Sequence, residues 1–140
     1  LASVEKEYDI ALLDCPPNLS LTSVNAMVAA DLFLIPIDGG SFSLNGLADL
    51  LDALEEVKES ENINYAVFRN EYAKSNKLIN DYLHEELKSL NGHVLETTVR
   101  RSESIGQASV TGESLLNYKA SSTAILDYKR LAKEVLKYLR

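Results

Sequence analysis

The chain has 140 residues, of which 46% are hydrophobic and 25% are charged, and this composition suits one globular domain with its own core. Its formal net charge of −7 gives no support to binding of a polyanion by the molecule as a whole. The single cysteine excludes an internal disulfide, and no apolar stretch approaches the roughly 18 residues that a membrane span needs. We therefore expect a cytoplasmic protein without a membrane segment.

The start of the chain indicates a piece of a longer protein. The sequence begins at Leu1 without an initiator methionine, and residues 1–9 resemble the last turn of a helix that runs into a strand. We expect a fragment.

Apolar runs typical of strands alternate along the chain with longer segments of helical period. We expect strands over residues 10–13, 32–37, 65–68 and 94–99, and helices over residues 21–30, 44–57, 78–87 and 125–139. This alternation predicts an α/β fold with a mostly parallel sheet flanked by helices. No linker interrupts the pattern, so we expect one domain over residues 1–140.

The first apolar run, "YDIALLDCPP", ends on an acid, Asp14, that is followed by Cys15, Pro16 and Pro17. Residues at the carboxyl ends of strands in open α/β sheets face the ligand site. An apolar strand that ends on aspartate is the Walker B arrangement, in which the carboxylate holds Mg²⁺ through a water beside a triphosphate. The two prolines stiffen the following segment, as a nucleotide switch requires. The alternative is a strand-end aspartate that caps the next helix.

Three stretches together resemble the ParA/MinD group of deviant-Walker ATPases, and within it the ParA (Soj) partition branch. The stretch "YDIALLDCPPNLSLTSVNAMVAAD" resembles the Walker B and switch II region, and "FSLNGLADLL" resembles the "yfalEGL" segment. The third, "RRSESIGQASVTGESLLNYKASSTAILDYKRLAKEV", resembles the C-terminal motif. They occur in the family's order and cover nearly the whole chain, so the resemblance is more specific than any one motif.

The resemblance implies a P-loop nucleotidase that segregates plasmid or chromosomal DNA. Its cofactors would be ATP and Mg²⁺, and it would form a homodimer around the nucleotide. A centromere-binding, ParB-like partner would stimulate hydrolysis, and the dimer would hold nonspecific DNA on the nucleoid. A non-enzymatic truncated interaction module and a MinD-like positioning ATPase are the alternatives.

One family motif does not occur in these 140 residues. Relatives begin with a glycine-rich phosphate loop of the type KGGxGKT, whereas Gly39 and Gly40 are followed here by Ser41 and Phe42, with no lysine near. The chain is thus expected to be the C-terminal part of a ParA-like ATPase. Because backbone amides of that loop supply most of the phosphate binding, we expect the chain alone neither to bind ATP tightly nor to turn it over.

The resemblance assigns roles to individual residues. Asp14 would be the catalytic Walker B carboxylate and would hold Mg²⁺ through a water. Pro16 and Pro17 would form switch II beside the nucleotide. Asn70 would lie next to the adenine, although an asparagine at this place is also typical of a turn. Arg101 matches the arginine of the "PR" loop near the base.

Two positions near these residues depart from the pattern or need a plainer interpretation. Arg100 replaces the proline of the "PR" loop, which leaves the rigidity of that loop open. Asp38 ends the second predicted strand, where relatives more often carry glutamine or glutamate. Cys15 is interpreted as a small buried residue.

DNA binding is implied less directly, because Ser75 and Ser104 stand where relatives carry basic residues. Residues 119–140 hold six basic side chains against two acidic ones, so this tail could substitute for them. The alternatives are an ordinary solvated helix face and a MinD-like membrane helix, which the packing of its aliphatic residues on the sheet disfavours. The candidate DNA contacts are Lys74, Lys77, Arg100, Lys129, Arg130, Lys133 and Lys137.

Overall fold

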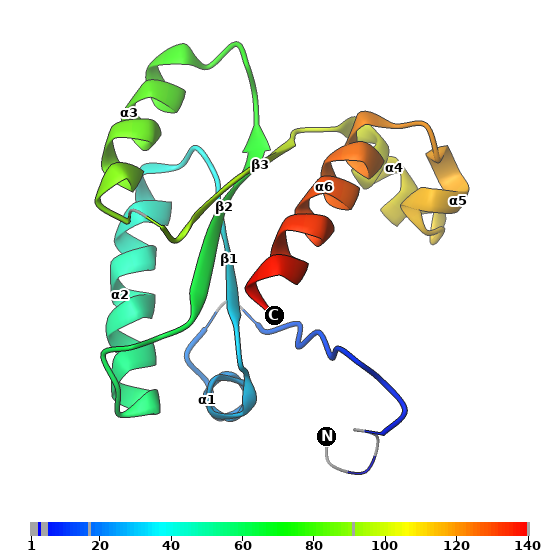
Figure 1. Cartoon of the computed structure of the whole chain (residues 1–140). Helices are drawn as coiled ribbons and strands as arrows, with labels where there is room; N and C mark the ends of the chain where they lie inside the picture. The colour runs from blue at the N-terminus through cyan, green and yellow to red at the C-terminus, as the bar shows by residue number, and fades with distance from the viewer. Residues whose placement is uncertain (1–2, 4–5, 17, 91, 140) are drawn as a thin grey trace.

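Helices and strands alternate up to Arg100, and the rest of the chain is helical. The computed structural model describes residues 3, 6–16, 18–90 and 92–139 (Figure 1). In chain order the elements are α1 (Leu21–Ala29), β1 (Phe33–Ile37), α2 (Ser41–Lys58), β2 (Tyr65–Tyr72), α3 (Lys77–Leu87), the 3₁₀ helix η1 (Lys88–Leu90), β3 (Val94–Arg100), α4 (Glu103–Thr111), α5 (Leu115–Lys119) and α6 (Thr123–Tyr138).

The three strands form one parallel sheet in the order β1-β2-β3. Helix α2 connects β1 to β2, and α3 with η1 connects β2 to β3, as parallel neighbours require. The α/β fold that the alternating pattern predicted is therefore confirmed. The register of β2 against β3 shifts between Val67 and Arg69 and again between Arg69 and Tyr72, so β2 is irregular near its carboxyl end.

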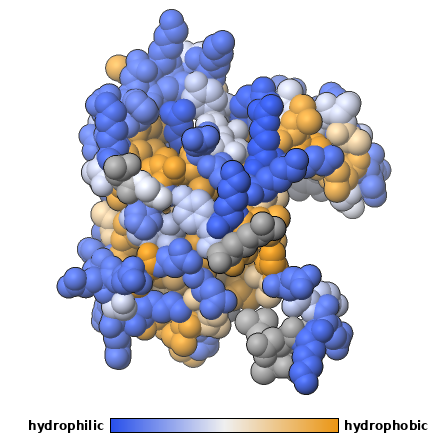
Figure 2. Space-filling view, viewed as in Figure 1, coloured by the Kyte–Doolittle hydropathy of each residue, from blue (hydrophilic) through white to orange (hydrophobic). Residues whose placement is uncertain are grey.

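After β3 the chain forms a short helical hairpin, which the sequence pattern did not predict. Helices α4 and α5 lie beyond the end of β3, away from α2 and α3 (Figure 1). Gly112 ends α4 with a φ of 70°, a left-handed conformation that glycine adopts without strain. Hydrophobic surface gathers over this hairpin and around α1 (Figure 2), and Val110 of α4 is 90% exposed.

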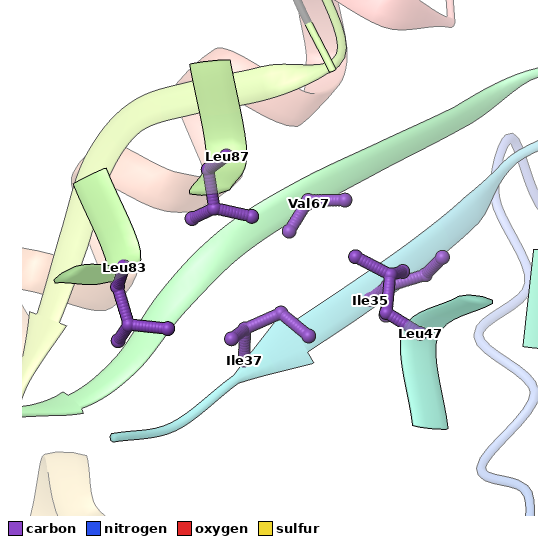
Figure 3. Close-up of a cluster of buried hydrophobic side chains, with 6 residues drawn as sticks. All are labelled: Ile35, Ile37, Leu47, Val67, Leu83 and Leu87. Atoms are coloured by element: carbon purple, nitrogen blue, oxygen red, sulfur yellow. The ribbon is translucent and has the colours of Figure 1, made fainter. Parts of the chain in front are cut away.

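The central strand, β2, is covered on both faces of the sheet. On one face, Ile35, Ile37 and Val67 of the strands pack against α2 and α3 through Leu47, Leu83 and Leu87 (Figure 3). On the other face, the buried cluster is formed by Ala66, Phe68, Leu95, Val99 and Leu131, the last from α6. Burial on both faces explains the uninterrupted apolar run over residues 65–68 of the central strand, β2.

The predicted strand over residues 10–13 is wrong. These residues form no strand, none of the three strands pairs with them, and the side chain of Leu12 is 90% exposed. An apolar run has the side chains of a buried strand, but a strand is stable only where a neighbour pairs with its backbone. The segment lacks such a neighbour here. Cys15 is likewise exposed rather than buried.

Candidate site at the carboxyl edge of the sheet

The three parallel strands end at the same edge of the sheet, where ligands of open α/β folds bind. Asn70 lies near the end of β2 and Arg101 directly follows β3. Arg101 donates its backbone N–H to the carbonyl of Tyr72 at 3.1 Å, so the structure brings the ends of β2 and β3 together. A small pocket opens at this edge, and its lining includes Ile37, Gly39, Asn70, Tyr72, Asn76 and Leu83.

The shape of the pocket depends on a local distortion of β2. Glu71 has a φ of 50°, which is a left-handed conformation for a residue with a side chain, and it coincides with the register shift of β2. The guanidinium of Arg69 lies over the ring of Tyr72, 4.9 Å from its centroid. Asn70, between them in sequence, is half-buried and lines the pocket.

The loop after β2 is fixed to the start of α3. The carbonyl of Ala73 accepts hydrogen bonds from the backbone N–H of Asn76 and from the side-chain amide of Asn80, both at 3.0 Å. Both asparagines also line the pocket. Neither was predicted as a site residue, because only the fold brings them beside Asn70.

At the end of β1, the carboxylate of Asp38 occupies the start of α2. It accepts a hydrogen bond from the Gly40 N–H at 2.9 Å and another from the Ser43 hydroxyl. The Ser43 hydroxyl, followed by the Gly40 N–H, lowers the pKa of Asp38 below its ordinary value. The backbone N–H of Gly40 therefore has a carboxylate partner within the chain.

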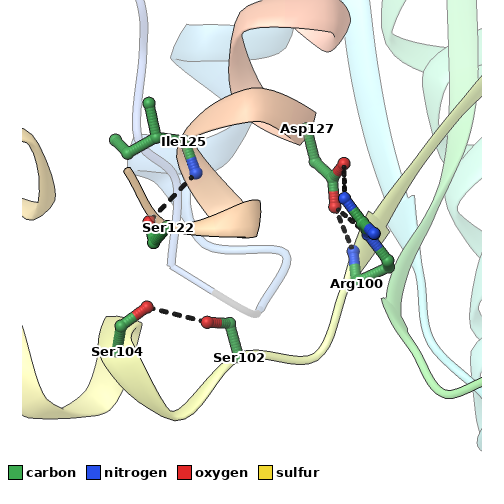
Figure 4. A network of polar contacts seen from close by, with 6 residues as sticks. All are labelled: Arg100, Ser102, Ser104, Ser122, Ile125 and Asp127. Atoms are coloured by element: carbon green, nitrogen blue, oxygen red, sulfur yellow. Dashed lines mark hydrogen bonds and ion pairs between the residues drawn. The ribbon is translucent and has the colours of Figure 1, made fainter. Parts of the chain in front are cut away.

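Behind the edge, Arg100 forms an ion pair with Asp127 of α6 (Figure 4). The Nε of Arg100 donates to Oδ2 and Nη2 donates to Oδ1, each at 2.8 Å, and the Arg100 backbone N–H donates to Oδ2 at 3.1 Å. Asp127 is 2% exposed, whereas the Arg100 side chain is 45% exposed. The Arg100 side chain, by hydrogen bonding, holds the pKa of Asp127 below its ordinary value, and Asp127 raises that of Arg100.

Sequence reasoning missed Asp127, although its position carried a signal. It stands between Ala124 and Leu131 at helical spacing, and both of these are buried. An acid on the apolar face of a helix needs a partner when it is buried. The pattern alone did not show that Arg100 would be that partner.

The structure does not bring the other nucleotide-site candidates to the edge. Asp14 and Pro16 are exposed in the segment before α1, and neither lines the pocket that contains Asn70. Pro17 lies outside the described residues. The alternative role of Asp14 as a helix cap does not hold either, because Ser20 is the N-cap of α1. The Walker B role of Asp14 stays a prediction.

The residues predicted to contact DNA are all exposed. One of them, Arg100, forms the ion pair with Asp127. Lys74 and Lys77 lie before and at the start of α3. On α6, Leu131 and Val135 pack toward the sheet, and the helix presents four basic residues to solvent, Lys129, Arg130, Lys133 and Lys137. No helix of the described chain has the length and apolar character to cross a membrane. DNA binding itself stays a prediction.

Asn70 and Arg101 have side chains that could contact the base of a nucleotide. An amide such as Asn70 can hydrogen-bond a base, and an arginine such as Arg101 can stack on one. In the part of the chain that the structure describes, no three histidine, cysteine, aspartate or glutamate side chains gather as a metal site.

The chain is similar in sequence to several known proteins. A family model described as an AAA domain matches residues 1–67. The chain is 28% identical to the chromosome-partitioning ATPase Soj of Treponema pallidum, over 97% of the chain and 55% of that protein. It is 30% identical to the chromosome partitioning protein ParA of Caulobacter vibrioides, over 92% of the chain and 49% of that protein. It is 30% identical to the sporulation initiation inhibitor protein Soj of Bacillus subtilis, over 96% of the chain and 54% of that protein.

The parallel sheet flanked by helices defines the class of the protein as an α/β fold. Within this class the chain is a ParA/Soj-like sequence, and the resemblance that its motifs predicted is confirmed. The chain spans about half the length of the curated relatives it matches.

Proposed function

We propose that this chain is the C-terminal part of a ParA-type ATPase that segregates plasmid or chromosomal DNA. The parent protein binds ATP and Mg²⁺, dimerises around the nucleotide, holds nonspecific DNA, and hydrolyses ATP when a centromere-binding partner stimulates it. The observation that supports this function best is the match to ParA and Soj proteins along more than nine tenths of the chain. A single domain over residues 1–140 is part of the same proposal.

In this proposal the carboxyl edge of the sheet holds the base. Asn70 and Arg101 contact the adenine, which is supported by the hydrogen bond that joins Arg101 to Tyr72, two residues after Asn70. ATP supplies the phosphoryl group that is transferred to water. Residues 76 and 80 fix the loop that closes the pocket, so they position Asn70 rather than reacting.

Asp14 acts toward Mg²⁺ through a water, and Pro16 and Pro17 form the switch beside it. For this role residues 10–13 must pair as a strand, since only then does Asp14 stand at the carboxyl edge with Asn70 and Arg101. The exposed, apolar side chains of this segment support a strand that is completed by a neighbour outside the present chain.

Nucleotide binding by the full gene product tests the proposal. Calorimetric titration with ATP and Mg²⁺ is expected to detect binding that Asn70→Ala and Arg101→Ala weaken. Lys88→Ala serves as the matched control, because Lys88 pairs only with Glu85 on the surface among the described residues. Equal affinity of all four proteins would contradict the assigned base site.

We expect the 140-residue chain alone to bind ATP weakly. A base contact and one carboxylate acting through water supply too little free energy without a phosphate loop, whose amides are not replaced by Gly40. Submillimolar affinity of this chain in the same titration would contradict the expectation.

A second candidate is a non-enzymatic interaction module that keeps a family surface without nucleotide chemistry. It is favoured by the sequence, because no KGGxGKT loop occurs among these 140 residues. Mass spectrometry of the native gene product separates the two. A longer product that contains a KGGxGKT loop supports the ATPase, and a native 140-residue product supports the module.

A further inference from the structure

The backbone at the end of β3 is held from two sides. Asp127 of α6 accepts the N–H of Arg100 at 3.1 Å, and the carbonyl of Tyr72 in β2 accepts the next N–H, that of Arg101, also at 3.1 Å. Successive amides of an extended chain point in opposite directions, so one contact fixes each side. Together they set the place and direction in which the chain leaves the sheet at Arg101.

The side chain of Arg100 also fixes the orientation of this contact. Two of its guanidinium N–H groups meet the two oxygens of Asp127 at 2.8 Å, a paired geometry that tolerates little rotation. Asp127 itself has little freedom, because it is 2% exposed in the first turns of α6. The N-terminal turn of α6 is fixed in turn by Ser122, whose hydroxyl accepts the N–H of Ile125 at 3.3 Å (Figure 4).

The contact between Asp127 and Arg100 restrains the backbone at position 100, as the covalent ring of a proline would. A proline fixes φ and carries no N–H donor. Arg100 keeps its donor and a freely variable φ, and Asp127 binds that donor and the side chain together. The rigidity that the sequence left open at this position is therefore supplied by α6.

We propose that Asp127 is a positioning residue for base recognition. By binding Arg100 it holds the backbone of Arg101 beside the end of β2, where Asn70 lies, without touching the nucleotide itself. This inference rests on the proposed function, in which Asn70 and Arg101 contact the adenine. Asp127 then determines how well the site distinguishes one base from another, while phosphate binding depends on other residues.

The test compares base preference in the full gene product. ATP and GTP affinities, each with Mg²⁺, are measured for the wild type, Asp127→Asn and Glu134→Gln, below the melting temperature of every variant. Asp127→Asn is expected to reduce the ratio of ATP to GTP affinity by roughly tenfold, since small misplacements of a contacting group have large effects. Glu134→Gln is the matched control, because Glu134 also binds α6 to β3 but contacts Glu96 and Thr97.

Amide hydrogen exchange without nucleotide gives a second readout on the same proteins. The Arg101 amide is expected to exchange faster in Asp127→Asn and at the wild-type rate in Glu134→Gln. Arg100→Lys keeps the charge but not the paired geometry, so it is expected to behave like Asp127→Asn in both measurements.

The outcomes separate the two proposals. A wild type that binds neither nucleotide overturns the proposed function and with it the base-positioning role. A wild type that prefers ATP, with the preference and the slow Arg101 exchange retained in Asp127→Asn, overturns the role of Asp127 alone. Equal losses in Asp127→Asn and Glu134→Gln also overturn it, because they indicate general loosening of α6.

Discussion

Two carboxylates of α6 accept hydrogen bonds from the backbone of β3, and both have lowered pKa values. The Arg100 side chain lowers the pKa of Asp127 against the opposing effect of burial. Burial raises the pKa of Glu134, but hydrogen bonds from Thr97 and Glu96 lower it by more. Both groups are therefore more acidic in the folded chain than in the unfolded chain.

This difference predicts a loss of stability in acid. A carboxylate with a lowered folded-state pKa stabilises the fold above its unfolded pKa of about 4, and this stabilisation is lost as the pH falls through the folded value. The free energy of unfolding is expected to fall below about pH 4, and to fall less steeply in Asp127→Asn. Urea unfolding at a series of pH values measures it.

Asp81→Asn is the control for this measurement, because Asp81 is exposed on α3. Its pH profile is expected to follow the wild type. Parallel profiles of the wild type and Asp127→Asn would contradict a stabilising ion pair at this position.

At the residue scale, strand-end positions were predictable from the sequence and tertiary partners were not. Asn70 and Arg101 follow apolar runs, so their place at the carboxyl edge could be expected from the pattern. The contact of Asp127 with Arg100 joins residues 27 positions apart, and nothing in the local pattern selects that pair. Glu71 was not predicted to adopt a left-handed backbone, because its conformation comes from the irregular pairing of β2.

At the scale of elements, α6 runs along the outer edge of β3 and covers it. Asp127 contacts Arg100, Glu134 contacts Glu96 and Thr97, and the Tyr138 hydroxyl donates to the Gly92 carbonyl at 3.1 Å. Residues 127 and 134 are seven positions apart, which corresponds to about 10.5 Å along the helix. Three to four residues of strand span about 10–13 Å, so the two carboxylates match the spacing of the exposed N–H groups. An edge strand is thereby protected from pairing with another chain.

The exposed face of α6 gives the test for DNA binding. If its lysines contact DNA phosphates, Lys129→Glu with Lys133→Glu is expected to weaken binding of a random duplex by the ATP-bound full gene product. The slope of log affinity against log salt is also expected to fall by about two, because two phosphate contacts are lost. Fluorescence anisotropy at several salt concentrations measures both quantities.

A matched change on another surface serves as the control for α6. Lys6 and Lys88 are exposed and lie outside α6, so Lys6→Glu with Lys88→Glu changes the net charge equally. If this variant weakens binding as much as the α6 variant does, the effect is one of net charge, and the solvated-face interpretation of α6 stands.

Among the elements, those with a clear period were predicted, namely the three paired strands and helices α1, α2, α3 and α6. Helices α4 and α5 were missed, since α4 contains Gly106 and an exposed Val110, and α5 has only five residues. The strand predicted over residues 10–13 was wrong for a different reason. The segment has the apolar side chains of a buried strand, but whether it pairs depends on a neighbouring strand in the sheet and not on its own sequence.

At the scale of the whole molecule, apolar side chains remain on the surface near the open edge of β1. Leu12, Leu21, Val28 and Leu34 are exposed there or in the segment and helix that precede it, and β1 pairs with β2 alone among the described strands. Open edges and apolar surface favour association between chains. We expect the 140-residue chain to self-associate, by strand pairing or exchange between copies.

Sedimentation velocity over a range of concentrations tests this expectation. Leu12→Asp is expected to shift the chain toward monomer, and Leu78→Asp on α3 is the matched control, because Leu78 is 84% exposed outside this region. A wild-type chain that stays strictly monomeric at high concentration would contradict the prediction.

The central claim is that the parent is an ATPase in which Asp14 acts on Mg²⁺ and the attacking water. Partner-stimulated ATP turnover of the full gene product, measured for the wild type and Asp14→Ala together with their melting temperatures, tests it most directly. Turnover is expected to fall by orders of magnitude, since charge neutralisation at the transferred phosphoryl group supplies most of the rate. The melting temperature is expected to stay unchanged, because an acid at a strand end that faces a cleft contributes little to the core. Unchanged stimulated turnover in Asp14→Ala would contradict the claim.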